Sequence, residues 1–198
     1  VNNPWISKDP WIIASEIAVN SARGRNSRFV KRGKEIIASG NYQPFSYSEM
    51  ASAIGTLEMQ NGSRKSCRNF INIALERPND NSLAQAEWLL GENRDLSLCF
   101  GNYDYLKNKA EADSRYAYFK DDFKAALCSG IDWIADYPFD PSPIYFSAEM
   151  AYTFVKDYET AIDIINLGLR ANSNDAGLLN NLAYCYALSG NLEKAESI

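Results

Sequence analysis

The sequence predicts an all-α protein in which antiparallel helix pairs stack on one another as an α-solenoid. The C-terminal part of the chain matches itself after a shift of thirty-four residues, so that Tyr152 corresponds to Tyr186 and Ala161 corresponds to Ala195. Within each copy the apolar residues recur three and four positions apart, as they do on one face of a helix. Repetition at this period is typical of stacked helical hairpins.

The composition excludes disordered and membrane-spanning classes of protein. Of the 198 residues, 46% are hydrophobic and 23% are charged, which is usual for a folded globular protein. No apolar run has the length that crosses a bilayer, and residues 1–20 lack the basic start and the apolar centre of a signal peptide. We therefore expect a cytoplasmic protein that makes no membrane contact.

Residues that commonly carry catalysis or bind metals are scarce. Histidine is absent, which removes the commonest general base and metal ligand. The cysteines lie far apart without a CxxC pair, and we expect free thiols at Cys67, Cys99, Cys128 and Cys185. The carboxylates have no spacing that favours a catalytic pair. We therefore expect no enzyme activity, no metal and no cofactor.

The clearest repeat lies at the C-terminal end. It contains, in order, a bulky residue, a Leu-Ala pair, a tyrosine, a turn glycine and an alanine in the second helix: Leu179, Leu182, Ala183, Tyr186, Gly190 and Ala195. This order resembles the tetratricopeptide repeat (TPR) family. The resemblance implies helix pairs stacked into a right-handed superhelix that binds other proteins. The preceding copy, 142–175, departs from the pattern with Glu149 at the small position and Lys156 at the turn.

The repeats divide the chain into three parts. Residues 1–91 carry divergent TPR-like repeats, and residues 105–198 carry the C-terminal repeats. The register fails over 92–104, which is predicted to be an irregular joint within one continuous solenoid, because stacked repeats do not bury their apolar faces alone. The last repeat is truncated, so we expect the chain to belong to a longer protein.

Helix starts are predicted from capping residues. Asp9 is expected to cap the first helix, with Pro10 as its first residue. Ser46 has Glu49 three positions later, which is the spacing of a capping box and predicts a second helix start. Ser142, followed by Pro143, is expected to cap the first helix of the copy over 142–175.

The resemblance also implies a peptide-binding groove. In the family, fixed positions of each first helix line this groove, and the matching residues here are mostly aromatic: Tyr118, Phe119, Phe146, Met150, Phe154 and Tyr184. Stacked first helices lie side by side, so these side chains are expected to form one apolar strip that a partner covers. A helix phase that differs by one residue would instead bury some of them in the core, and this alternative stays open.

One segment, 23–34, is strongly basic. It contains six cations and no acid, while the remaining chain carries a net charge of about −11, since the whole is −5. The six are Arg23, Arg25, Arg28, Lys31, Arg32 and Lys34. Such a segment is either a phosphate or nucleic-acid contact, or a solvated helix face that pairs with acidic neighbours. The net negative charge of the whole chain and the absence of interleaved aromatic residues beyond Phe29 argue against nucleic-acid binding.

The sequence favours a non-catalytic scaffold that binds a protein or peptide in its groove. Two alternatives remain open. The first is a nucleic-acid-binding helical repeat that uses the basic segment 23–34. The second is a regulatory module of an enzyme whose catalytic domain lies outside these residues.

Overall fold

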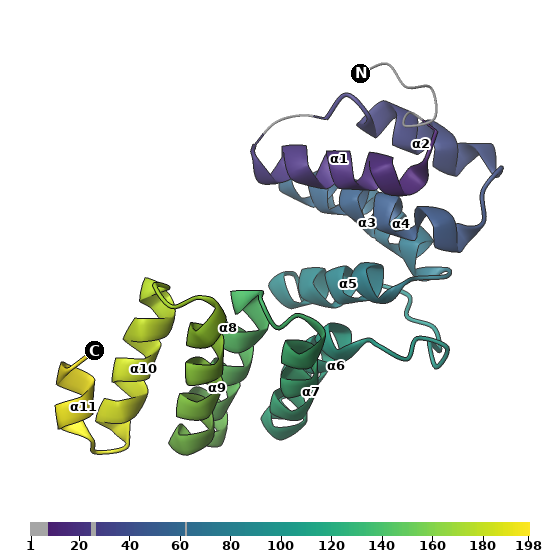
Figure 1. Cartoon of the computed structure of the whole chain (residues 1–198). Coiled ribbons are helices and arrows are strands. Elements are labelled where there is room, and N and C mark those ends of the chain that lie inside the picture. The colour runs from purple at the N-terminus through teal and green to yellow at the C-terminus, as the bar shows by residue number, and fades with distance from the viewer. Residues whose placement is uncertain (1–7, 25–26, 62) are drawn as a thin grey trace. The chain divides into compact units, whose positions relative to one another are not determined.

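The computed structural model describes residues 8–24, 27–61 and 63–198. These residues form helices and connecting segments, without a strand (Figure 1). The chain divides into two compact units, Val1–Ala112 and Asp113–Ile198, which we call unit 1 and unit 2. The boundary lies beyond the joint expected at 92–104, inside the first helix of unit 2.

Unit 1 consists of two helical hairpins and a fifth helix (Figure 1). Its helices are α1 (Pro10–Ala22), α2 (Val30–Ser39), α3 (Pro44–Asn61), α4 (Arg64–Leu75) and α5 (Asp80–Glu92). The predicted start of α1 is confirmed, because the Asp9 carboxylate accepts hydrogen bonds from the backbone N–H groups of Trp11 and Ile12, and Pro10 is the first helical residue.

The predicted start of the second hairpin is wrong. Helix α3 begins at Pro44, so Ser46 lies inside the helix, and its N–H bonds the carbonyl of Gln43 rather than Glu49. Prolines recur at 10, 44 and 78, always at or just before the start of a first helix of unit 1. Proline fits such positions because the first helical N–H needs no partner within the helix.

The core of unit 1 is formed by the facing sides of the hairpins. Its fully buried side chains include Ile13, Ile17, Ile36, Met50, Ile54 and Ile71. Gly55 permits the close approach of α3 and α4, because a Cβ at this position would lie 2.7 Å from Cδ1 of Ile71. The hairpin packing therefore depends on a glycine at a helix crossing, as well as on apolar periodicity.

The segment 93–109, which we call the strap, is not helical but is tied to unit 1. The hydroxyl of Tyr103 donates to the carbonyl of Leu75, and the hydroxyl of Tyr105 donates to the carbonyl of Pro78, each at 2.8 Å. Leu96 is buried in the core around α4 and α5. The irregular segment expected at 92–104 therefore covers α4 and α5 as part of unit 1.

Unit 2 contains three consecutive hairpins (Figure 1). Its elements are α6 (Ala110–Phe119), α7 (Phe123–Asp136), α8 (Pro141–Glu149), the π-helix η1 (Met150–Val155), α9 (Tyr158–Ala171), α10 (Ala176–Leu188) and α11 (Leu192–Glu196). Helix α8 begins earlier than predicted, because Asp140 rather than Ser142 is its N-cap and Pro141 its first residue. The Asp140 carboxylate accepts from the Ser142 N–H, so Ser142 already belongs to the first turn.

The three hairpins of unit 2 turn at equivalent corners. The corner residues have left-handed backbone angles, with φ of 56° at Asp121, 64° at Lys156 and 83° at Gly190. The next residue, Asp122, Asp157 or Asn191, is the N-cap of the second helix and accepts from the N–H three positions later. The turn glycine of the repeat is thus replaced in two corners by residues that carry a Cβ.

The core of unit 2 lies between successive hairpins. Ile144, Ala148, Ala161, Ile165, Leu178 and Cys185 are almost fully buried. Gly168 lets α9 approach α8, because a Cβ there would lie 2.6 Å from Cγ2 of Ile144. Ala161 is completely buried and Ala195 is partly buried, as expected for two small residues at helix crossings.

Candidate functional site

The structure brings most of the predicted groove residues together in unit 2. The ring of Tyr118 lies at the centre, 5.9 Å from Phe119, 6.1 Å from Phe146 and 5.9 Å from Phe154, measured between centroids. These contacts are edge to face, an arrangement that aromatic rings prefer over face-to-face sandwiches. Helices α6 and α8 and the π-helix η1 therefore contribute to one cluster of rings.

Two rings of the second helix α7 complete the cluster. Phe123 stacks on Phe154 at 4.1 Å between centroids with an angle of 15° between the rings, and Trp133 lies 5.9 Å from Phe146. Prediction by family position missed both, because it considered first helices alone. We use the name aromatic surface for the set Tyr118, Phe119, Phe123, Phe146 and Phe154.

The aromatic surface is accessible at its centre. Tyr118 is 37% exposed, and the other four rings are partly buried. Met150 was expected to lie beside them, and this prediction is wrong, since its side chain is 1% exposed and belongs to the core of unit 2. Met150 follows the buried Ser147 by three residues and therefore continues the buried face of the helix.

Tyr184 belongs to a second aromatic contact. Its ring is 51% exposed and packs edge to face against Tyr152, with the centroids 5.7 Å apart. Tyr152 is on the π-helix η1 and Tyr184 is on α10, so this pair joins two successive first helices. The six predicted groove residues are therefore not one strip. Four lie in the cluster around Tyr118, Tyr184 instead contacts Tyr152, and Met150 lies in the core.

The aromatic surface is mainly apolar. Its side chains are four phenylalanines and a tyrosine, with the cation of Arg115 lying 5.2 Å from the ring of the adjoining Trp133. Across the described ranges, no three Cys, Asp or Glu side chains are grouped as a metal site would require. Partly exposed rings that already touch one another present apolar area at a small entropic cost on binding.

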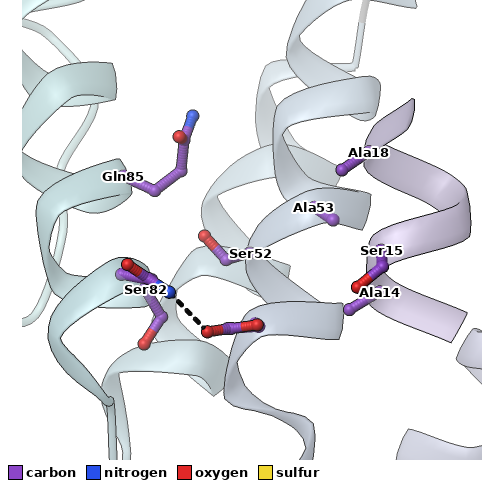
Figure 2. Close-up of a pocket in the computed structure, with 9 residues that line it drawn as sticks. Ala14, Ser15, Ala18, Ser52, Ala53, Ser82 and Gln85 are labelled. Carbon is purple, nitrogen blue, oxygen red and sulfur yellow. Dashed lines mark hydrogen bonds between the residues drawn. The ribbon is translucent and has the colours of Figure 1, made fainter. Parts of the chain in front are cut away.

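A pocket that sequence reasoning missed lies in unit 1. It has a volume of about 230 Å³ and lies among the first helices α1, α3 and α5 (Figure 2). We call it the unit-1 pocket, and its lining residues are Ala14, Ser15, Ala18, Glu49, Ser52, Ala53, Asn81, Ser82 and Gln85. The side chains are small or polar, so no apolar stripe marked them in the sequence. The prolines at 10, 44 and 78, which lie at or just before the starts of these three helices, were a sequence signal that could have aligned them.

Hydrogen bonds hold the polar side chains of the unit-1 pocket in place. The Glu49 Oε1 atom accepts from Asn79 Nδ2 at 2.6 Å and from Asn81 Nδ2 at 2.8 Å, the latter bond drawn as a dashed line in Figure 2. Gln85 Nε2 donates to Thr56 Oγ1 at 3.0 Å. Ser52 is 3% exposed, and its hydroxyl has no hydrogen-bond partner within the described ranges.

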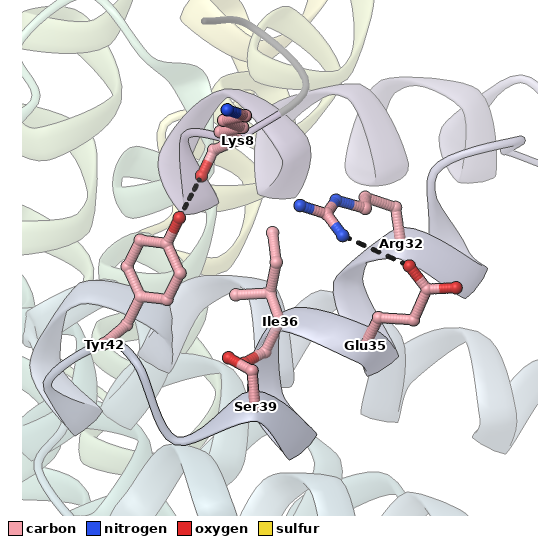
Figure 3. A network of polar contacts seen from close by, with 6 residues as sticks. All are labelled: Lys8, Arg32, Glu35, Ile36, Ser39 and Tyr42. Atoms are coloured by element: carbon pink, nitrogen blue, oxygen red, sulfur yellow. Dashed lines mark hydrogen bonds and ion pairs between the residues drawn. The ribbon is translucent and has the colours of Figure 1, made fainter.

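The basic segment is partly neutralised within unit 1. Arg32 pairs with Glu35 at 3.2 Å on the surface of α2 (Figure 3), and Lys34 pairs with Glu58 at 2.5 Å. Lys34 also lies 5.4 Å from the ring of Phe70. Arg25 lies outside the described residues. These contacts correspond to the expectation that the cations pair with acidic neighbours.

The end of helix α2 is fixed by contacts that do not involve the cations. Tyr42 donates its hydroxyl to the carbonyl of Lys8 at 3.0 Å, and Ser39 donates to the carbonyl of Ile36 at 2.7 Å (Figure 3). The first contact joins the chain before α1 to the chain after α2. The basic helix is therefore anchored as a structural part of the first hairpin.

Comparison with known proteins identifies the fold. No protein-family model and no curated protein matches the chain. Solved structures of MamA share its fold. MamA AMB-1 matches with a TM-score of 0.50 and 13% identity over 96% of this chain and 94% of its own, and MamA MSR-1 with a TM-score of 0.50 and 14% identity over 94% and 90%.

The likeness to MamA confirms the predicted fold class, an all-α solenoid of TPR-like helix pairs. Sequence identity this low shows a shared fold and does not identify a binding partner. Among the described residues, no helix is both long and apolar enough to cross a bilayer.

Proposed function

We propose that the chain is a non-catalytic, TPR-type scaffold that binds a peptide segment of a partner protein on the aromatic surface of unit 2. The observation that carries this proposal is the ring of Tyr118, which is 37% exposed while it touches four other rings. Clustered and partly exposed aromatic side chains are the usual anchors of protein interfaces. The second helix α7 adds the rings of Phe123 and Trp133, which contact Phe154 and Phe146.

Other features of the chain support the same proposal. The four cysteines are free thiols, two of them buried, which fits a reducing compartment such as the cytoplasm. The acidic partners of Arg32 and Lys34 reduce the charge that the basic segment would offer to nucleic acid. We therefore place the binding site on the aromatic surface rather than on the segment 23–34.

The test uses peptides selected against the full chain from a display library. Tyr118→Ala is expected to weaken the binding of the selected peptides at least tenfold, because a buried aromatic anchor contributes about 2 kcal/mol or more. Tyr116→Ala is the matched control. Tyr116 lies on the same helix, is 52% exposed and contacts Lys120 rather than the ring cluster.

Thermal melts of both variants accompany the affinity measurements. Both tyrosines are exposed enough that truncation is expected to leave the fold intact, whereas the stacked ring of Phe154 is a poorer probe because it also packs on the core. Peptides that bind wild type and Tyr118→Ala equally well would refute the proposed site.

A further inference from the structure

The strap lies on unit 1 in the way that a bound peptide lies on a receptor. In its first half the side chains alternate, because Leu96 is buried and Leu98 is half-buried, whereas Ser97 and Cys99 are exposed. A period of two is that of an extended chain, whose successive side chains point to opposite sides. Both leucines pack on the core around α4 and α5, so the strap contacts unit 1 with one side and leaves the other to solvent.

Polar groups of α4 and of the turn after it hold the strap. The Asn72 side-chain oxygen on α4 accepts from the backbone N–H of Cys99 at 3.0 Å. The two tyrosines of the strap donate to the carbonyls of Leu75 and Pro78. The last carbonyls of a helix have no partner within the helix, so the end of α4 offers acceptors to any donor that reaches it. None of these contacts requires that the bound segment be joined to α5.

Few contacts hold the strap compared with the helices beneath it. Leu96 is the one buried side chain of the segment 93–109. The ion pair between Arg64 and Asp95 joins two well-exposed side chains, and exposed pairs contribute little to stability. Segments with few buried apolar contacts open at a lower free energy than the core does. An open strap would leave the apolar side of α4 and α5 in water, so exchange for another segment costs less than release alone.

We propose that the surface of α4 and α5 under the strap, which we call the strap site, binds an extended segment of a partner protein that displaces the strap. The partner segment has the pattern of the strap itself: two apolar residues separated by one, and tyrosines five and seven positions after the second. In the free chain the strap inhibits this binding, because a tethered segment competes at an effective concentration of about a millimolar. The strap site belongs to unit 1, so this proposal and that for the aromatic surface of unit 2 can fail independently.

The test uses a fluorescein-labelled peptide with the sequence of residues 93–109 and the change Cys99→Ser, titrated into the full chain and followed by fluorescence anisotropy. Tyr103→Phe combined with Tyr105→Phe in the chain removes two hydrogen bonds of the strap and leaves the strap site intact. This double variant is expected to bind the peptide at least tenfold more tightly than wild type, because its own competitor is weaker. Tyr116→Phe, on α6 outside the strap, is the matched control and should bind like wild type. Equal affinity of the double variant and wild type would overturn the proposal.

Two further variants of the double-variant chain locate the bound peptide. Asn72→Ala removes the contact with the peptide backbone and should weaken binding roughly fivefold. Tyr118→Ala, in the aromatic surface, should leave the affinity unchanged. The reverse result would place the peptide on the aromatic surface and overturn the strap site. A peptide with Leu96→Ser and Leu98→Ser should not bind, and wild-type affinity for it would also contradict the proposal.

Hydrogen exchange of the wild-type chain measures the opening of the strap directly. The backbone amide of Cys99 is expected to exchange faster than the amides in the middle of α4 and α5, because the strap opens while these helices stay folded. Protection of the Cys99 amide equal to that of the two helices would show that the strap is released only when unit 1 unfolds, and the proposal would then be wrong.

Discussion

The corner at Lys156 offers a direct test of how the repeat tolerates the loss of its turn glycine. Lys156 has φ of 64° and ψ of 26°, whereas the equivalent corner has Gly190 at φ of 83°. We consider the reciprocal exchange of these two residues, Lys156→Gly and Gly190→Lys. Lys156 is exposed, and a Cβ at Gly190 would meet no atom within 4 Å, so changes in backbone conformation dominate both substitutions.

The expected magnitude follows from two opposing terms. A residue with a Cβ costs about 1–2 kcal/mol in the left-handed region. Glycine removes this cost, but it gives the unfolded chain more conformational entropy, which lowers the folding stability by roughly 0.5–1 kcal/mol. Lys156→Gly should therefore stabilise the protein by about 0.5–1 kcal/mol, and Gly190→Lys should destabilise it by a similar amount. For a chain of this size, each kcal/mol corresponds to about 2–4 °C in the melting temperature.

Thermal unfolding followed by circular dichroism and calorimetry measures the effect. The two corners are separate in sequence and do not share a partner, so the double exchange should return close to the wild-type midpoint. A lower midpoint in Lys156→Gly would refute the reasoning, because it would mean that the lysine is not held in the left-handed region. An unchanged midpoint in Gly190→Lys would refute it equally.

Three further predictions concern buried and capping groups. Ser147→Ala should raise stability by about 1 kcal/mol in urea unfolding, because the buried Ser147 hydroxyl has no partner in the described ranges; a loss would show an undetected bond. Hydrogen bonds from Thr160 lower the pKa of Asp157, so its contribution to stability is present above the ordinary aspartate pKa of 3.8 and is lost as pH falls through the lowered value. Asp157→Asn should therefore flatten the acid limb of stability against pH, and an unchanged acid limb would contradict this. Burial raises the pKa of Cys185 to about 11. Iodoacetamide at pH 8 should therefore label the exposed thiols of Cys99 and Cys128, but should not label Cys185 or the buried Cys67 until the chain unfolds. Labelling of Cys185 in the folded protein would contradict this.

The helical hairpins of unit 2 were predictable because their signal is periodic. Apolar spacing and the thirty-four-residue shift aligned Ala148 with Leu182 and Ala161 with Ala195. The first three are buried, and Ala195 is partly buried. Helix starts were less predictable, since capping depends on which of several neighbouring polar residues bonds the free N–H groups. At α8 the carboxylate of Asp140 provides the cap, although Ser142 is also a favourable N-cap residue.

The candidate site was only partly predictable from the sequence. Family positions identified Tyr118, Phe119, Phe146 and Phe154, because these residues follow the first-helix repeat. They missed Phe123, whose contact with Phe154 depends on how the second helix packs. They included Met150, which lies in the core of unit 2 three residues after the buried Ser147. The unit-1 pocket could not be found from hydrophobic periodicity, because it is lined by alanines, serines and amides.

The strap has a consequence for how such chains are built and divided. A helical repeat array normally needs a terminal element with a polar outer side, since the last apolar face would otherwise meet water. In unit 1 the strap provides this cover, with Leu96 inserted into the core and Tyr103 and Tyr105 bonded to backbone carbonyls. We therefore expect the stability of unit 1 to depend on the strap, because a cut at Glu92 would remove Leu96 and the two tyrosine hydrogen bonds and would expose the apolar side of α4 and α5.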